Sequence, residues 1–235
     1  MACCYEDGRG WCREQESVWT DESGREYCLF HAPVGNKGVD TLSFNEALFT
    51  LILKARIEER ECDLSGTIFD GPIRFSRFSG ESEFFPAINF SKALFTGNAS
   101  FSVACFKHRA RFTEARFEAN ADFLQTSFME NADFTHVEFG GHTSFAGAAF
   151  SGHAGFSGTS FSGDTLFNDT QFLSGVTFSG ALFREKAVFY GARFNGTTYF
   201  FGTTFRRDVE FSRFQFQGPI DFSNVKIAGK MNTLF

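Results

Sequence analysis

The chain of 235 residues is poor in several residue types that most globular folds use freely: it contains 4 Pro, 3 Met, 2 Trp and 4 Tyr. No stretch approaches the roughly 18 consecutive apolar residues of a membrane-spanning helix, which excludes an integral membrane protein. The first residues, Met1 to Asp7, lack the basic and apolar regions of a signal peptide, and this predicts a cytoplasmic protein.

Phenylalanine, in contrast, is present 36 times, far above ordinary usage. Many of these phenylalanines are regularly spaced, and two residues before each of the regularly spaced ones stands Ala, Thr or Val. From Phe101 to Phe211 the spacing alternates between 5 and 6 without a break, at positions 101, 106, 112, 117, 123, 128, 134, 139, 145, 150, 156, 161, 167, 172, 178, 183, 189, 194, 200, 205 and 211. Such a fixed period is the mark of a repeat architecture.

The alternating spacing excludes the two simplest folds. In a helix each position turns by about 100°, so steps of 5 and 6 place successive phenylalanines on different faces. The intervening Gly, Ser, Thr and Asn also favour turns over a helix. In one extended strand a step of 5 reverses the side chain and a step of 6 does not. A chain that turns after each short segment keeps every Phe inside, so the period predicts an all-β fold, a β-solenoid.

These units resemble the pentapeptide-repeat family, whose repeat centres on Leu or Phe with a small residue two positions earlier, as in Ala110-Arg111-Phe112 and Ala192-Arg193-Phe194. The resemblance implies a right-handed quadrilateral β-helix with four repeats per coil over residues 64–235. One extra residue in every second unit predicts coils of about 22 residues with two looser corners. The first coil or two should be irregular. Ile68, Ile73, Phe78, Phe84, Phe90 and Phe95 fit as inward residues only with two consecutive steps of 6, and Phe69, Phe75 and Phe85 compete with them.

Residues 1–40 carry no repeat and predict a small zinc-binding segment. The spacing Cys4-x7-Cys12-x15-Cys28-x2-His31 supplies three thiolates and one imidazole, a closed tetrahedral set for structural Zn²⁺, with Cys3 as an alternative to Cys4. The alternatives are a disulfide, disfavoured in the cytoplasm, or unrelated free thiols. The run Tyr27-Cys28-Leu29-Phe30-His31-Ala32-Pro33 is also similar to the short Cys/His leader of some bacterial pentapeptide-repeat proteins.

Residues 41–63 predict an α-helix that caps the N-terminal end of the solenoid. Ser43 is the expected N-cap, with Glu46 at the matching position of a capping box, and the apolar stripe comprises Phe44, Leu48, Leu51, Ile52, Ala55 and Ile57. At the other end an apolar tail covers the last coil or forms a homodimer, and we favour the dimer. Its residues are Val225, Ile227, Met231, Leu234 and Phe235.

The residues predict no enzyme. His108, His136, His142 and His153 are scattered over outward positions, and no Ser/His/Asp set, carboxylate pair or phosphate loop recurs on one face. The best interpretation is a rigid scaffold for another protein, with Tyr190, Tyr199 and Phe201 as candidate contact residues. The alternative, from the family, is DNA imitation that modulates a type II topoisomerase. It is weakened because residues 97–235 hold 12 acidic and 12 basic side chains. Nucleic-acid binding is weaker still, since acidic neighbours cancel the arginine clusters.

Overall fold

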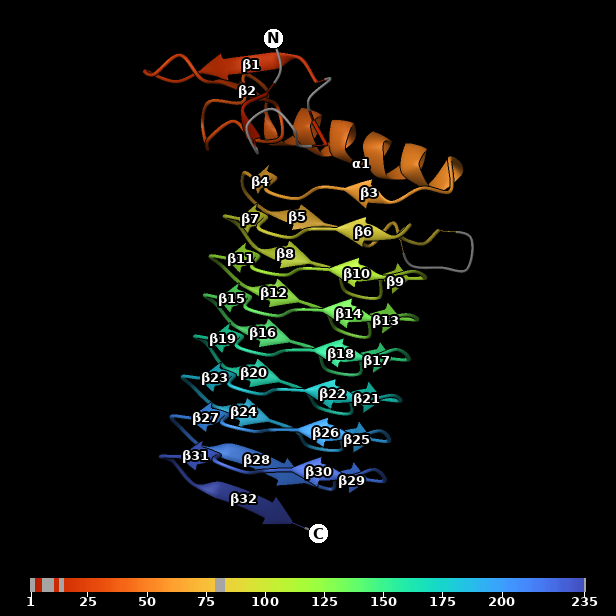
Figure 1. Cartoon of the computed structure of the whole chain (residues 1–235), viewed down its shortest axis with the longest axis vertical. Coiled ribbons are helices and arrows are strands. Elements are labelled where there is room, and N and C mark those ends of the chain that lie inside the picture. Colours follow the sequence, from red (N-terminus) through yellow and green to blue (C-terminus); the bar gives the residue numbers. More distant parts are fainter. Residues whose placement is uncertain (1–2, 6–10, 13–14, 79–82, 235) are drawn as a thin grey trace.

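The computed structural model describes residues 3–5, 11–12, 15–78 and 83–234. Two N-terminal strands, β1 (Ser17–Thr20) and β2 (Glu26–Cys28), form an antiparallel hairpin, and the helix α1 (Thr41–Ile57) follows. The rest of the chain winds into a right-handed, four-sided solenoid of about eight coils, with one parallel sheet on each side (Figure 1). The predicted fold class is confirmed.

Each side of the solenoid is named here by its first strand. The β3 face contains β3 (Cys62–Asp63), β6 (Ile88–Asn89), β10 (Ala110–Arg111), β14 (Ala132–Asp133), β18 (Ala154–Gly155), β22 (Val176–Thr177), β26 (Thr198–Tyr199) and β30 (Ile220–Asp221). The β4 face contains β4 (Ile68–Phe69), β7 (Leu94–Phe95), β11 (Arg116–Phe117), β15 (Glu138–Phe139), β19 (Ser160–Phe161), β23 (Leu182–Phe183), β27 (Thr204–Phe205) and β31 (Lys226–Ile227).

The β5 face contains β5 (Ile73–Arg74), β8 (Ala99–Ser100), β12 (Ala121–Asp122), β16 (Thr143–Ser144), β20 (Thr165–Leu166), β24 (Ala187–Val188), β28 (Val209–Ser212) and β32 (Met231–Leu234). The β9 face contains β9 (Cys105–Phe106), β13 (Ser127–Phe128), β17 (Ala149–Phe150), β21 (Gln171–Phe172), β25 (Arg193–Phe194) and β29 (Gln215–Phe216). Along the chain the faces follow in the order β3, β4, β5, β9, so the β3 and β5 faces are opposite, as are the β4 and β9 faces.

Phenylalanine rings fill the interior in four stacked columns, one for each face. Phe156, for example, lies fully buried between Phe134 and Phe178, with ring centroids 5.0 Å apart on both sides and nearly parallel planes. Strand partners in neighbouring coils differ by 22 in residue number, as Ala110 and Ala132 do. The predicted coil length and the inward position of the Phe ladder are therefore confirmed.

The small residues beside each Phe have a second role where they are threonine. The buried hydroxyl of Thr159 donates to the carbonyl of Phe134 at 2.7 Å, and Thr203 donates to Phe178 at the same distance. A hydroxyl buried in this position needs such an acceptor, because an unpaired polar group in the interior is destabilising.

The corners of each coil are of two kinds, as the alternating spacing predicted. Every second corner is a tight turn that contains one residue with a left-handed backbone. This position recurs once in every half-coil, at Lys92, Val103, Glu114, Gln125, His136, Gly147, Gly158, Asp169, Gly180, Gly191, Gly202, Arg213 and Asn224. The other two corners hold the extra residue. There an Asn or Asp side chain accepts the backbone N–H one coil further on, as Asp208 does from Lys230 at 2.8 Å.

The first coil is longer than the others and differs in detail from the prediction. Cys62 pairs with Ile88, a difference of 26 in residue number against 22 in the later coils. Phe69, Phe75 and Phe85 take the inward positions, whereas Ile68 and Phe84 are only partly buried. The other predicted inward residues, Ile73, Phe78, Phe90 and Phe95, are buried as expected. The longer coil absorbs the register slip, so Phe69 enters the core in place of Ile68, and Phe85 in place of Phe84.

Helix α1 lies across the N-terminal end of the solenoid (Figure 1). The ring centroids of Phe44 and Phe69 are 6.1 Å apart, and those of Phe49 and Phe75 are 5.9 Å apart. The N-cap is Asp40 rather than the predicted Ser43: its carboxylate accepts the backbone N–H of Ser43 at 2.8 Å, which lowers the pKa of Asp40. The predicted apolar stripe is buried or half-buried except at Ile57, the last residue of the helix, which is exposed.

Candidate functional site

Four side chains near the N-terminus converge in one buried cluster. Cys3, Cys12, Cys28 and His31 each offer one ligand atom, and these atoms lie within 4.8 Å of one another. Cys28 ends β2, and a tight turn follows in which the backbone N–H groups of His31 and Ala32 both donate to the Cys28 carbonyl. This turn places Cys28 and His31 on the same side, as their short spacing predicted.

The orientation of the His31 ring is fixed by its neighbours. Its Nε2 lies 3.0 Å from the carbonyl oxygen of Ser65. Because a carbonyl only accepts, Nε2 carries the proton and Nδ1 presents its lone pair to the thiols. Nδ1 lies 3.1 Å from the sulfur of Cys12, 3.3 Å from that of Cys28 and 3.7 Å from that of Cys3. The Tyr5 ring stacks on the imidazole at 4.0 Å.

These distances match what a tetrahedral metal centre needs. With metal–sulfur bonds of about 2.3 Å and metal–nitrogen bonds of about 2.0 Å, the sulfur-to-nitrogen edges of the tetrahedron are about 3.5 Å long. The hydrogen bond with Cys12 is the largest cause that lowers the pKa of Cys28 to about 4, so one thiolate is ready as a ligand. The bond to Cys28 and burial raise the pKa of Cys12. In the described part of the chain, no other group of three or more Cys, His, Asp or Glu side chains is arranged to hold a metal.

Cys3, and not Cys4, occupies the position that the sequence assigned first to Cys4. The backbone N–H of Cys4 donates to the carbonyl of Glu26 in β2, and its side chain is only partly buried. Consecutive residues of an extended segment point to opposite sides, so only one of the two cysteines can face the cluster. A hydrogen bond with Cys4 instead raises the pKa of Tyr27 to about 12.

The cluster is joined to the first coil of the solenoid. The carbonyl of Ser65 accepts both His31 and the indole N–H of Trp11, each at 3.0 Å. Close by, the backbone N–H of Ile68 donates to the carbonyl of Phe30 at 2.8 Å, as it would to a preceding coil. The backbone of the turn that carries Cys28 and His31 thus ends the hydrogen-bond ladder of the β4 face.

Lys37 is a buried residue of this region that sequence reasoning missed. Its ammonium group donates to the carbonyls of Leu29 at 2.7 Å and Ala32 at 3.1 Å, and it lies 4.7 Å from the ring centre of Phe44. Burial lowers the pKa of Lys37 to about 8. A single lysine in a loop gives no sequence signal of such a position.

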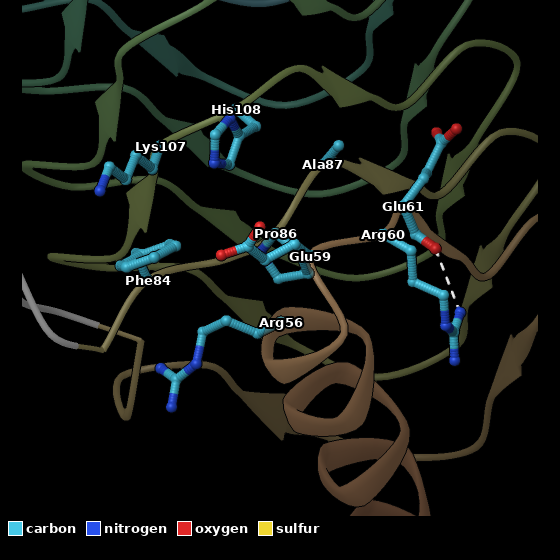
Figure 2. Close-up of a pocket in the computed structure, with 9 residues that line it drawn as sticks. All are labelled: Arg56, Glu59, Arg60, Glu61, Phe84, Pro86, Ala87, Lys107 and His108. Atoms are coloured by element: carbon cyan, nitrogen blue, oxygen red, sulfur yellow. Dashed lines mark hydrogen bonds between the residues drawn. The ribbon is translucent and has the colours of Figure 1, made fainter.

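A separate hollow of about 460 Å³ lies between the end of α1 and the first two coils (Figure 2). Figure 2 shows Phe84 with Lys107 on one side and Arg56 on the other, and both cations lie over its ring, at 4.5 and 5.7 Å. Ion pairs join Arg60 with Glu58 and Glu61 with Arg111, and Nδ1 of His108 lies 3.4 Å from a carboxylate oxygen of Glu130. This arrangement joins the helix end to the coils and unites no nucleophile with a base.

The three predicted contact residues do not form one patch. Tyr199 ends β26, and Phe201 lies in the tight corner that follows, with 42% and 49% of their surfaces exposed. Tyr190 lies in the tight corner after β24, diagonally across the solenoid, and is half-buried under Arg213. The structure therefore groups Tyr199 with Phe201 and separates Tyr190 from them.

The predicted dimer residues lie on the last coil and the strand after it. Ile227 in β31 and Met231 in β32 are partly exposed. Phe235 lies outside the described residues, as does the side chain of Leu234. End-to-end pairing through these residues stays a prediction.

Comparison with known proteins identifies the repeat. Residues 104–149 and 178–226 match a family model described as pentapeptide repeats, with nine copies. Searches of curated proteins and of solved structures gave no match. No helix in the described part of the chain is long and apolar enough to cross a membrane.

Proposed function

Because the chain is a pentapeptide-repeat protein, we propose that it acts as a non-catalytic scaffold that binds another protein. The closed packing of the interior is the main observation that supports this proposal. Four columns of stacked phenylalanine rings fill the coils from end to end. Within the described residues of the coils this packing leaves no room for a ligand, so we expect binding to use the outward faces and corners.

The corner that bears Tyr199 and Phe201 is the best candidate contact on those surfaces. Exposed aromatic side chains this close in sequence supply rigid apolar area, and Tyr adds a hydroxyl that can pair with a partner. Their backbones are held by the coil ladder: Gly180 donates to the carbonyl of Phe201 at 2.8 Å. A partner would therefore meet a surface that loses little conformational freedom on binding.

We further propose that Cys3, Cys12, Cys28 and His31 bind a structural zinc ion. Three sulfur donors and one nitrogen leave no open coordination position, which suits a structural and not a catalytic site. The region from β1 to the start of α1 has little apolar core of its own, so a bound metal would provide much of its stability. In this proposal zinc holds the N-terminal segment over the first coil and protects the end of the rod.

The scaffold proposal is tested by affinity capture with mass spectrometry, comparing the wild type with the double variant Tyr199→Ser/Phe201→Ser. Tyr190→Ser is the matched control, because this residue lies at the diagonally opposite corner. We expect a defined protein to be recovered with the wild type and the control and lost with the double variant. Equal recovery with all three would contradict the assignment of this corner.

DNA imitation remains the second candidate within the family. It requires rows of carboxylates at the spacing of phosphates. Outward residues of the β5 face in successive coils are Ser100, Asp122, Ser144, Leu166, Val188 and Glu210, a column in which acids are isolated. A DNA supercoiling assay with a purified type II topoisomerase tests this candidate, and inhibition at stoichiometric protein would favour it over the scaffold.

A further inference from the structure

The β4 face carries opposite charges on its two halves. Toward the N-terminus its outward residues include Arg116, Glu118 and Glu138, whereas toward the C-terminus they include Arg184 and Arg206. All five side chains are exposed. The same division holds for the whole rod, since residues 97–180 contain 8 acidic and 4 basic side chains and residues 181–235 contain 4 acidic and 8 basic ones.

The acidic half has more carboxylates than cations on this face. Arg116 lies 3.6 Å from a carboxylate oxygen of Glu118 and 3.9 Å from one of Glu138. One guanidinium is therefore shared by two carboxylates, at distances that are long for an ion pair. The surplus negative charge stays open to a second cation.

The basic half has the converse arrangement. Arg184 and Arg206 occupy the same position in consecutive coils, about 4.8 Å apart along the rod. Within the described residues, neither has a carboxylate within ion-pair distance. Stacked like charges without a counterion are unfavourable, so this pair favours an anionic group from outside the chain.

Between the two halves the face is hollowed and lined by small residues. The hollow measures about 280 Å³, and its floor consists of Phe117, Gly140, Ser160 and Ser162, with Arg116, Glu118, Glu138 and Arg184 at its rim. A Cβ atom at Gly140 would come within 2.9 Å of the carbonyl oxygens of Phe117 and Glu118, so glycine keeps this floor open. The hollow has room for a side chain from another molecule, which would lie close to the carboxylates of Glu118 and Glu138.

The positions of these residues are related by a simple symmetry. The axis is a twofold axis that lies in the plane between the two faces, runs along the direction of β19 and is perpendicular to the rod. It turns the second rod end for end. Each residue then lies opposite a residue that occupies the same position in another coil. Equivalent positions in successive coils differ by 22 in residue number, so with Ser162 on the axis Arg206 lies opposite Glu118 and Arg184 lies opposite Gly140. Arg184 of one copy then enters the hollow of the other, beside Glu118 and Glu138.

We propose that two copies of this chain associate side by side and antiparallel through their β4 faces. The contact is isologous, so each ion-pair contact is made twice. The charge division favours this arrangement over an end-to-end dimer, which would bring two C-terminal regions of net charge +4 together. The proposal does not depend on the scaffold function, because it rests on the charges of the β4 face and not on the exposed aromatic residues Tyr199 and Phe201.

The expected association is weak and sensitive to salt. Seven facing coils span about 34 Å at about 4.8 Å per coil, and a face of this length and the width of a few side chains buries roughly 900 Å² in total, below the usual size of a stable interface. Exposed ion pairs are screened by salt. We therefore expect a monomer–dimer equilibrium that shifts toward monomer as the ionic strength rises.

Charge exchange tests the pairing directly by sedimentation velocity over a range of concentrations at low salt. Arg184→Glu and Glu138→Arg should each raise the dissociation constant at least tenfold, and the double variant should restore dimerisation. Arg193→Glu, the same change on the opposite β9 face, is the control and should leave the equilibrium unchanged. A wild type that stays monomeric at every concentration, or a double variant no better than the singles, overturns the proposal.

Cross-linking tests the axis. Ser162→Cys should give a dimer with a short bis-maleimide, because residue 162 faces its own copy. Ser151→Cys, exposed on the β9 face, should give no more dimer than the wild type, whose own cysteines set the background. Equal cross-linking of the two variants, or dimers that survive Arg184→Glu but are lost with Met231→Lys, would replace the lateral contact by the end-to-end one.

Discussion

Truncation of one central phenylalanine tests the packing on which the rod depends. Phe156 is fully buried, stacks on Phe134 and Phe178, and meets Phe145 and Phe167 edge-on at 5.3 and 5.6 Å. Replacing a buried Phe with Ala typically lowers the free energy of unfolding by about 3–5 kcal/mol. Aromatic pairs add about 0.5–1.5 kcal/mol each beyond burial. We expect Phe156→Ala to lower the free energy of unfolding by about 5 kcal/mol or more.

The measurement is urea unfolding followed by circular dichroism, with Phe201→Ala as the matched control. Phe201 is half exposed in a corner, so its truncation should lower the free energy of unfolding by less than about 1 kcal/mol. Because each coil contacts only its neighbours, the Phe156 variant should also show a broader transition as the two halves of the rod unfold separately. Equal effects of the two substitutions would refute the inward and outward assignments.

Three further predictions concern the metal site and the tight corners. The purified protein should contain one zinc per chain by elemental analysis; Cys3→Ser should lose it and Cys4→Ser should keep it, and the reverse result would return the ligand role to Cys4. The lowered pKa of Cys28, about 4, means that its thiolate stabilises the fold fully above the ordinary thiol pKa and that this contribution is lost as the pH falls through about 4. Because protons compete with a metal for cysteine sulfur, a chromogenic chelator should detect metal release on acidification and none at neutral pH. Val103 has φ 56°, a strained conformation for a β-branched residue, so Val103→Gly should raise the free energy of unfolding by about 1 kcal/mol. Gly147→Val, at an equivalent corner, should lower it by about 1–2 kcal/mol. Melting curves of the two variants that move in the same direction would contradict this account.

The regular part of the fold could be predicted in detail because one constraint repeats without exception. A large residue that must point inward at steps of 5 and 6 leaves one solution for the chain path, and the Ala, Thr or Val that accompanies each Phe supports the direction of each segment. The same reasoning is weaker in the first coil, where Ile68 and Phe69 or Phe84 and Phe85 compete. Spacing alone does not show which neighbour enters the core when the coil length changes.

The Cys/His cluster was predicted from spacing, with Cys4 as its first cysteine and Cys3 as the alternative, and the structure places Cys3 in it. Cys3 and Cys4 are equivalent in sequence terms, and the pairing of Cys4 with Glu26 in the strand beside it decides which of them turns inward. The helix start shifted for a similar reason, since both Asp40 and Ser43 are good N-caps and only the path of the preceding loop selects Asp40. Tyr190 was grouped with Phe201 because they are close in sequence, but the chain between them spans half a coil and carries them to opposite corners.

The recurrence of the tight corners in every half-coil has a consequence for how such a rod can change in length. Two half-coils of the same pattern make one coil, so the interior of the β3 face is interchangeable with that of the β5 face, and the β4 face with the β9 face. Removing one half-coil from the regular region would leave every later ring in an aromatic column but rotate all later surface residues to the opposite side of the rod. Removing a whole coil would shorten the rod and leave each surface on its original side. Insertion or deletion of a single half-coil can thus turn the surface of the C-terminal coils to the opposite side relative to the N-terminal cap. The aromatic core stays the same.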